Sequence, residues 1–315
     1  MLKPRTPNKV VVIGGGPAGL MAAEVIRGAG HLVDLYDAMP SVGRKFLMAG
    51  KGGLNLTHSE APEKFLQRYG AKRAQLEPMI EAFGPDALRA WAKGLGIKTF
   101  VGTSGRVFPS EFKAAPLLRA WLHRLRESGV RFHVRHRWVG WNDEGALAFQ
   151  SPQGEVLVEA DAVVLALGGG SWARLGSDAA WASILESRAI PVAPLQPANC
   201  GFNVNWSEHF RKKFSGAPVK AVAGRAGGEA PGLQGEFVIT ETGLEGGLIY
   251  ALAAALRGAI SASGSATLTL DLAPGRTQQR LVEDLSRPRG SESSANFLRK
   301  RAGMEGVKAG LLREF

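Results

Sequence analysis

Residues 9–20 read KVVVIGGGPAGL, and this stretch decides the fold class. The β-branched run at 9–13 predicts a buried strand, and residues 17–29 predict a helix that ends at Gly30. A second apolar run, LVDLY at 32–36, follows directly. A strand, a glycine turn, a helix and a second strand in this order predict a parallel βαβ unit with a right-handed crossover, and therefore an α/β fold of the Rossmann type.

The glycines of the turn have the spacing Gly14-x-Gly16-x-x-Gly19 of a dinucleotide-binding fingerprint. The first glycine permits the tight turn, the second lets a pyrophosphate approach the backbone, and the third lets helix and strand pack closely. The helix N-terminus offers N–H groups and a positive dipole end to the phosphates. Asp37 stands 18 residues after Gly19, where its carboxylate can accept hydrogen bonds from a ribose. These residues predict a dinucleotide site.

Composition limits the class of protein. The chain has 315 residues, of which 45% are hydrophobic and 21% charged, values that are ordinary for a globular protein with two domains. No apolar run is long enough for a transmembrane helix, and the N-terminus does not resemble a signal peptide. A single cysteine, Cys200, excludes an internal disulfide and a CxxC redox centre. We therefore expect a cytoplasmic protein that has no membrane partner.

The pattern of elements predicts two domains, at residues 1–190 and 191–315. Helices are expected at 73–83, 85–95 and 113–127, a hairpin at 98–109, strands at 130–139, 146–150 and 155–158, and a second central strand at 161–167. The proline-rich stretch PVAPLQPANCGFNV begins at residue 191 and indicates the boundary. Beyond it, strands are expected at 199–204, 235–240 and 266–271, a helix at 247–258, and a mostly helical, basic segment at 276–314.

Residues 38–59 are expected to form a long loop that serves the cofactor. Residues 43–57 read GRKFLMAGKGGLNLT, which combines two cations with glycines. Both FAD and NAD have a free 2′-hydroxyl for Asp37, so the acid does not separate them. Two features favour FAD, namely the position of the fingerprint at the start of the chain and the glycine-rich cationic segment that follows the acid. This segment is the nearest one able to line the path from the fingerprint to a distant isoalloxazine ring.

Five stretches of this chain carry a family resemblance. They are VVIGGGPAGLMAA at 11–23, GRKFLMAGKGGLNLTHSE at 43–60, SGRVFPSEFKAAPLLRAWL at 104–122, DAVVLALGGGSW at 161–172 and GEFVITETGLEGGLIYAL at 235–252. Together they resemble the HI0933-like, or BaiN-like, NAD(P)/FAD-dependent oxidoreductases of bacteria, and most closely an uncharacterised branch of these flavoproteins. The resemblance extends over residues 8–315. It implies a glutathione-reductase-type FAD domain with an inserted β-rich, barrel-like domain and a helical segment.

The resemblance also implies which residues bind the cofactor. The ADP part would be held by Gly14, Gly16, Pro17, Ala18, Gly19 and Asp37, the flavin path by Gly43, Arg44, Lys45, Gly52, Gly53 and Asn55, and the return to the sheet by Gly168 and Gly169. Many relatives have Arg-Cys-Asn where this chain has Gly53-Leu54-Asn55, so no thiol is expected there. Relatives also end with a glycine-rich segment that closes over the flavin. We do not find it before Phe315, so we expect either a sequence truncated inside the inserted domain or a shortened variant, and in both cases weaker FAD retention.

The resemblance implies an FAD-dependent oxidoreductase that acts on a small molecule, with NAD(P)H as a possible reductant. No second complete GxGxxG indicates whether NADH or NADPH is used, and the residues identify no catalytic acid or base and no metal site. Two alternatives stay open. One is a dehydrogenase that uses NAD(P) alone, and the other is a basic flavin-binding protein that docks on nucleic acid through the RKK run at 211–213. The net charge of +11 permits the second, but no aromatic-basic recognition module accompanies it.

Overall fold

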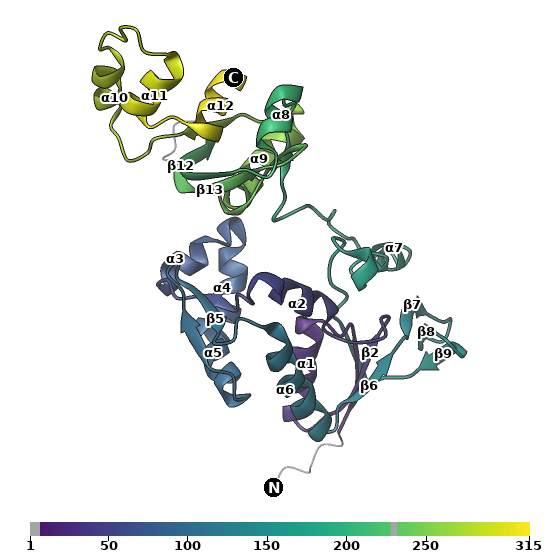
Figure 1. The fold of residues 1–315 in the computed structure, drawn as a ribbon. Coiled ribbons are helices and arrows are strands. Elements are labelled where there is room, and N and C mark those ends of the chain that lie inside the picture. Colours follow the sequence, from purple (N-terminus) through teal and green to yellow (C-terminus); the bar gives the residue numbers. More distant parts are fainter. Residues whose placement is uncertain (1–6, 228–231) are drawn as a thin grey trace. The chain divides into compact units, whose positions relative to one another are not determined.

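The computed structural model describes residues 7–227 and 232–315. The chain divides into two compact units, with the division between Leu195 and Gln196 (Figure 1). The sequence placed this boundary at residues 190–191, where the proline-rich stretch begins. Each unit has its own sheet and its own buried core, so the two are described separately.

The first unit is built on a parallel sheet of four strands. These are β1 (Lys9–Ile13), β2 (Leu32–Asp37), β6 (Arg131–Val134) and β10 (Ala162–Leu165), in the order β10-β1-β2-β6. Val12 of β1 lies opposite Leu35 on one side and Val164 on the other. The helix α1 (Pro17–Gly28) connects β1 to β2, which confirms the predicted βαβ unit and the Rossmann-type fold class.

The two faces of this sheet are covered by different structures (Figure 1). On one face, Val12 and Leu35 pack against α1 and against Leu117 and Trp121 of α6 (Ala114–Glu127). On the other face, Val11 contacts an antiparallel sheet made of β7 (Arg137–Trp141), β8 (Leu147–Ser151) and β9 (Gly154–Val158). Burial of each such apolar side chain stabilises the fold by about 1.5–3 kcal/mol. Because both faces are covered, β1 is a continuous apolar run in the sequence.

The strand β10 differs from its prediction. We expected a central strand at 161–167, but β10 pairs only with β1 and stands at the end of the described sheet. As a result Val163 and Leu165 remain 38% and 39% exposed. The prediction was wrong because an apolar run of four to seven residues does not specify how many neighbours a strand has.

The expected loop at 38–59 is also partly wrong, because it contains helical turns. Residues 44–52 form the helix α2 (Arg44–Ala49) and the short 3₁₀ helix η1 (Gly50–Gly52). Phe46 packs on the core that α6 helps to form, and Gly43 lies against the side chain of Leu118 in that helix. These contacts with α6 hold residues 43–52 in one defined position, whereas a loop without such contacts would have none.

The remaining elements of the first unit surround this frame. A three-stranded sheet in the order β3-β5-β4 contains the expected hairpin. The elements are β3 (Thr57–His58), β4 (Thr99–Val101), β5 (Arg106–Pro109), α3 (Pro62–Gln67), η2 (Gly70–Lys72), α4 (Arg73–Ala82), α5 (Pro85–Gly94), η3 (Ala173–Leu175) and α7 (Trp181–Glu186).

The second unit contains a five-stranded antiparallel sheet in the order β11-β14-β13-β12-β15. The helix α9 (Gly247–Ser263) packs on it through Leu248, Ile249 and Leu252. The other elements are β11 (Phe202–Asn203), α8 (Glu208–Phe214), β12 (Pro218–Ala226), β13 (Leu233–Ile239), β14 (Gly243–Glu245), β15 (Leu268–Asp271), α10 (Gln278–Leu285), α11 (Ser294–Ala302) and α12 (Gly306–Glu314). The sequence missed β12, whose register shifts at a bulge between Val219 and Val222. Within the described residues, no helix has the length and apolarity that crossing a membrane requires.

Candidate cofactor site

A cavity of about 200 Å³ lies in the first unit, where β1, β2 and β10 end. In open α/β sheets, ligands bind at the carboxyl ends of the strands, beside the point where the strand order reverses. Nine of the fourteen cofactor residues expected from the sequence line this cavity: Gly14, Gly16, Pro17, Asp37, Gly43, Arg44, Lys45, Gly168 and Gly169. The cavity therefore brings the first and second glycine motifs together with the start of α2.

The three fingerprint glycines occupy different surroundings. Gly14 has a φ of 111°, and a Cβ there would collide with the carbonyl oxygen of Ala166. A Cβ on Gly19 would collide with the carbonyl oxygen of Gly14, so this glycine sets the distance between α1 and the strand. A Cβ on Gly16 would meet no atom within 4 Å, because Gly16 faces the open cavity. Only the middle glycine leaves space that a ligand can use.

The N-terminus of α1 opens into the same space. Its N-cap is Gly16, and no side chain caps the first turn. The first N–H groups of a helix have no partner within the helix, and they carry the positive end of its dipole. An uncapped helix end beside an open glycine is suited to bind an anionic phosphate.

Asp37 lies at the end of β2 and binds the backbone of the glycine turn. Its two carboxylate oxygens accept hydrogen bonds from the backbone N–H groups of Gly15 and Met39, each at 2.7 Å. Burial raises the pKa of Asp37 above its ordinary value, although the two N–H groups and the nearby Arg44 and Arg137 oppose this shift. The carboxylate retains lone pairs that can accept a ribose hydroxyl.

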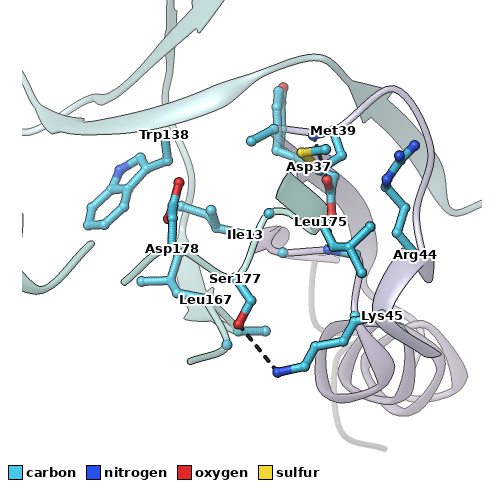
Figure 2. Close-up of a pocket in the computed structure, with 18 of the residues that line it drawn as sticks. Ile13, Asp37, Met39, Arg44, Lys45, Trp138, Leu167, Leu175, Ser177 and Asp178 are labelled. Atoms are coloured by element: carbon cyan, nitrogen blue, oxygen red, sulfur yellow. Dashed lines mark hydrogen bonds between the residues drawn. The ribbon is translucent and has the colours of Figure 1, made fainter. Parts of the chain in front are cut away.

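The two cations at the start of α2 extend in different directions (Figure 2). The Lys45 Nζ donates hydrogen bonds to the hydroxyl oxygens of Ser171, at 2.6 Å, and Ser177, at 3.4 Å. The Arg44 Nη1 donates to the Ser41 hydroxyl at 3.4 Å. The buried Arg44 Nε has no hydrogen-bond partner among the described residues. A buried donor of this kind fits a polar ligand group, because leaving it unpaired costs about 1–3 kcal/mol.

The cavity is also lined by residues that the sequence did not single out, among them Trp138 and Asp178, which are labelled in Figure 2. Another is Arg137, whose Nη1 lies 2.9 Å from the Asp178 Oδ2 in an ion pair. This pair links β7 to the segment before α7. The only sequence signal for Arg137 was the basic run RFHVRHR at 131–137, a pattern that is also typical of a solvated surface.

Five expected cofactor residues do not line the cavity. Ala18 and Gly19 lie inside α1, where Gly19 has the packing role described above. The other three, Gly52, Gly53 and Asn55, follow α2 and do not line the cavity, and a Cβ on Gly53 would lie near the rings of Phe108 and Phe112. The candidate residues thus form two groups, one at each end of α2.

Two histidines do not follow the strand that we expected at 130–139. In one continuous strand, His133 and His136 would lie on opposite faces, but their ring centroids are only 5.9 Å apart. The strand β6 ends at Val134, and Arg135 has a φ of 59°, so the chain turns before His136. Both rings contact the ring of Tyr36. Among the described residues, no group of three or more His, Cys, Asp or Glu could hold a metal ion.

The fold and the cavity define the class of protein as one with a Rossmann-type dinucleotide-binding domain. The sequence profile of the HI0933-like protein Rossmann domain matches residues 8–308, so the chain belongs to this family. This match confirms the resemblance on which the expected fold was based.

Several known proteins are similar to this chain at low sequence identity. The 3-dehydro-bile acid delta(4,6)-reductase of Clostridium scindens is 28% identical over 247 residues, which are 76% of this chain and 58% of that protein. The 3-ketosteroid-delta4-(5alpha)-dehydrogenase of Rhodococcus jostii RHA1 has 17% identity and a TM-score of 0.41, over 54% of this chain and 47% of that one. A flavocytochrome c3 fumarate reductase in its open conformation has 18% identity and a TM-score of 0.46, over 70% of this chain and 48% of that one. The chain therefore spans about half the length of these proteins.

Proposed function

We propose that the protein is an FAD-dependent oxidoreductase whose flavin is reduced by NADH or NADPH and which acts on a small-molecule substrate. Membership of the HI0933-like family supports this proposal, as does the name of the curated relative, a reductase. The FAD-binding residues would be those expected from the sequence, with Arg137 added at the nucleotide end. The single cysteine is consistent with a cytoplasmic location, which is part of the proposal.

One observation carries the choice of a dinucleotide cofactor. The Gly16 position, the uncapped end of α1 and the Lys45 side chain all face the same cavity. A Cβ at Gly16 would project into that cavity, where the pyrophosphate of a dinucleotide approaches the backbone in this motif. The residues present therefore fit the ADP half of FAD.

Each residue has a separate part in holding the cofactor. The N–H groups at the start of α1 would bind the pyrophosphate, and Asp37 would accept a ribose hydroxyl. Lys45 would contribute a positive charge, and Arg44 would donate its unpaired Nε to a polar group of the ligand. When bound, FAD would supply hydride and electron transfer, and the protein would supply binding and orientation.

The test is a titration of the purified full chain, freed of flavin, with FAD and separately with NADH and NADPH. We expect a visible flavin spectrum with one FAD per chain, followed by bleaching on anaerobic addition of NADH or NADPH. The first oxidant to try is a 3-dehydro-bile acid, because the curated relative carries that name. A chain that takes up NAD(P)H but no FAD would instead be a dehydrogenase that uses NAD(P) alone, and the proposal would fail.

A further inference from the structure

Phe112 has a backbone conformation that is unusual for its residue type. Its φ is 60°, in the left-handed region that a residue with a Cβ rarely adopts. Its side chain is 49% exposed, although a phenyl ring is more stable when it is buried. Both features reduce stability, and strained residues of this kind concentrate at sites that bind ligands.

Phe112 belongs to a group of three rings, which we call the phenylalanine cluster: Phe100, Phe108 and Phe112. The ring centroid of Phe112 lies 5.0 Å from that of Phe100 and 5.4 Å from that of Phe108. Phe100 and Phe108 are paired across the β4–β5 hairpin. The hairpin therefore positions the rings of Phe100 and Phe108, whereas Phe112 follows the end of β5 and remains half-exposed.

The phenylalanine cluster lies against the glycine turn that follows α2. A Cβ on Gly53 would lie 3.2 Å from the ring of Phe112 and 3.6 Å from that of Phe108. The backbone N–H of Leu54 donates a hydrogen bond of 2.8 Å to the carbonyl oxygen of Phe112. The strained residue is thus tied to Gly53 and Leu54, in the turn that the family resemblance implies for the flavin path.

The helix α2 joins this turn to the nucleotide cavity. Lys45 lines the cavity at the start of the helix, and Gly53 lies beyond its end. The six residues of α2 rise by about 9 Å. In FAD the pyrophosphate and the isoalloxazine ring lie at opposite ends of the ribityl chain, as the nucleotide cavity and the phenylalanine cluster lie at opposite ends of α2.

We propose that Phe112 contacts the isoalloxazine ring of the bound cofactor and that the phenylalanine cluster forms an apolar wall for it. This inference rests on the proposed function. A flat π-system gains from offset or edge contacts with phenyl rings, which explains why an exposed ring is held in a strained conformation. The ADP half of the cofactor, at the other end of α2, does not depend on this ring.

The experiment measures the affinities of the full chain for FAD and for ADP by calorimetry, together with the melting temperature of each variant. Phe112→Gly removes the ring and accepts the left-handed φ, so the variant should remain folded. Phe112→Tyr keeps a ring. Ala189→Gly is the matched control for the backbone, because Ala189 also has a left-handed φ, of 56°, and does not line the cavity.

We expect Phe112→Gly to weaken FAD binding about tenfold and to leave the ADP affinity unchanged. Phe112→Tyr and Ala189→Gly should bind FAD as the unmodified chain does. Equal affinity of Phe112→Gly for FAD, or an equal loss for FAD and ADP, would overturn the inference. If the unmodified chain binds ADP but shows no gain for FAD, or binds neither, the proposed function itself fails, which is a separate result.

Discussion

The Nζ of Lys45 lies 2.6 Å from the hydroxyl oxygen of Ser171, to which it donates a hydrogen bond. Lys45 follows the first glycine motif, and Ser171 follows the glycines at 168–170, which are more than a hundred residues later. The contact therefore joins the two segments that follow the glycine motifs, at one side of the cavity. It also holds the ammonium group beside the cavity, so little reorganisation is needed when an anion binds.

Lys45→Met should weaken FAD binding at least tenfold. A hydrogen bond to a charged group contributes about 1.5–3 kcal/mol, and a tenfold change in affinity corresponds to about 1.4 kcal/mol. Lys93→Met is the control, because Lys93 is an exposed cation of α5 that does not line the cavity. Titration with FAD at two salt concentrations measures the effect. Equal affinities of the two variants would contradict a role for Lys45.

Asp37→Asn should lower both FAD affinity and stability. The N–H groups of Gly15 and Met39 donate to different oxygens of the Asp37 carboxylate. An amide has only one oxygen, so its NH₂ group would face one of these N–H groups and leave it without an acceptor. Leaving a buried N–H unpaired costs about 1–3 kcal/mol. Asp161→Asn is a close control, because the Asp161 carboxylate accepts from the backbone of Lys9 at 2.7 Å and lies outside the cavity lining. It should keep both its stability and its FAD affinity, because its single hydrogen bond needs only one oxygen. A parallel loss of FAD in both variants would refute the assignment.

FAD affinity should fall with acidification at a higher pH than for an ordinary aspartate. Burial raises the pKa of Asp37, so its carboxylate is protonated before an exposed carboxyl with a pKa of about 3.9. A carboxyl with a raised pKa binds its proton more tightly in the folded chain. Its ionisation therefore reduces stability as pH rises through the folded pKa, whereas ribose binding needs the ionised form. Dissociation constants measured between about pH 7 and 4 test this. A profile with the same step in Asp37→Asn would assign the step to another group.

Glu24 should be important for stability and not for the cofactor. Its carboxylate accepts hydrogen bonds from the indole N–H groups of Trp121, at 2.6 Å, and Trp91, at 3.2 Å, and lies 2.6 Å from the Arg124 guanidinium. Glu24→Ala leaves these donors without their acceptor, so we expect a loss of about 2–4 kcal/mol in the free energy of unfolding. Glu24→Gln keeps one acceptor and should lose less. Urea unfolding gives both values, and equal stability of Glu24→Ala and the unmodified chain would contradict the network.

The sequence was sufficient to predict the first strand, helix and second strand, because residues 9–36 carry their own turn glycines and a continuous apolar pattern. It was not sufficient for residues 44–52. Their helical turns depend on contacts with Leu118 and Ala114 of α6, which lie more than sixty residues away. In the same way, the ion pair of Arg137 with Asp178 depends on the return of the chain to the sheet. Local patterns predict elements, whereas contacts between distant segments complete the site.

The fingerprint glycines give a matched pair that separates folding from binding. Gly19→Ala places a Cβ into the carbonyl oxygen of Gly14, so the helix or the strand must shift. Gly16→Ala places its Cβ into the open cavity, with no protein atom within 4 Å. The φ of Gly16 is −80°, which alanine adopts without strain.

We therefore expect opposite behaviour from the two variants. Gly16→Ala should melt within about 2 °C of the unmodified chain but bind FAD at least tenfold more weakly, because the methyl group occupies the place of the pyrophosphate. Gly19→Ala should lose stability first, and with it FAD binding. Thermal melts with and without FAD distinguish the two cases, since a ligand raises the melting temperature only where it binds the folded state. If Gly16→Ala were stabilised by FAD as much as the unmodified chain, the pyrophosphate could not lie against Gly16, and the cavity would bind a different part of the ligand.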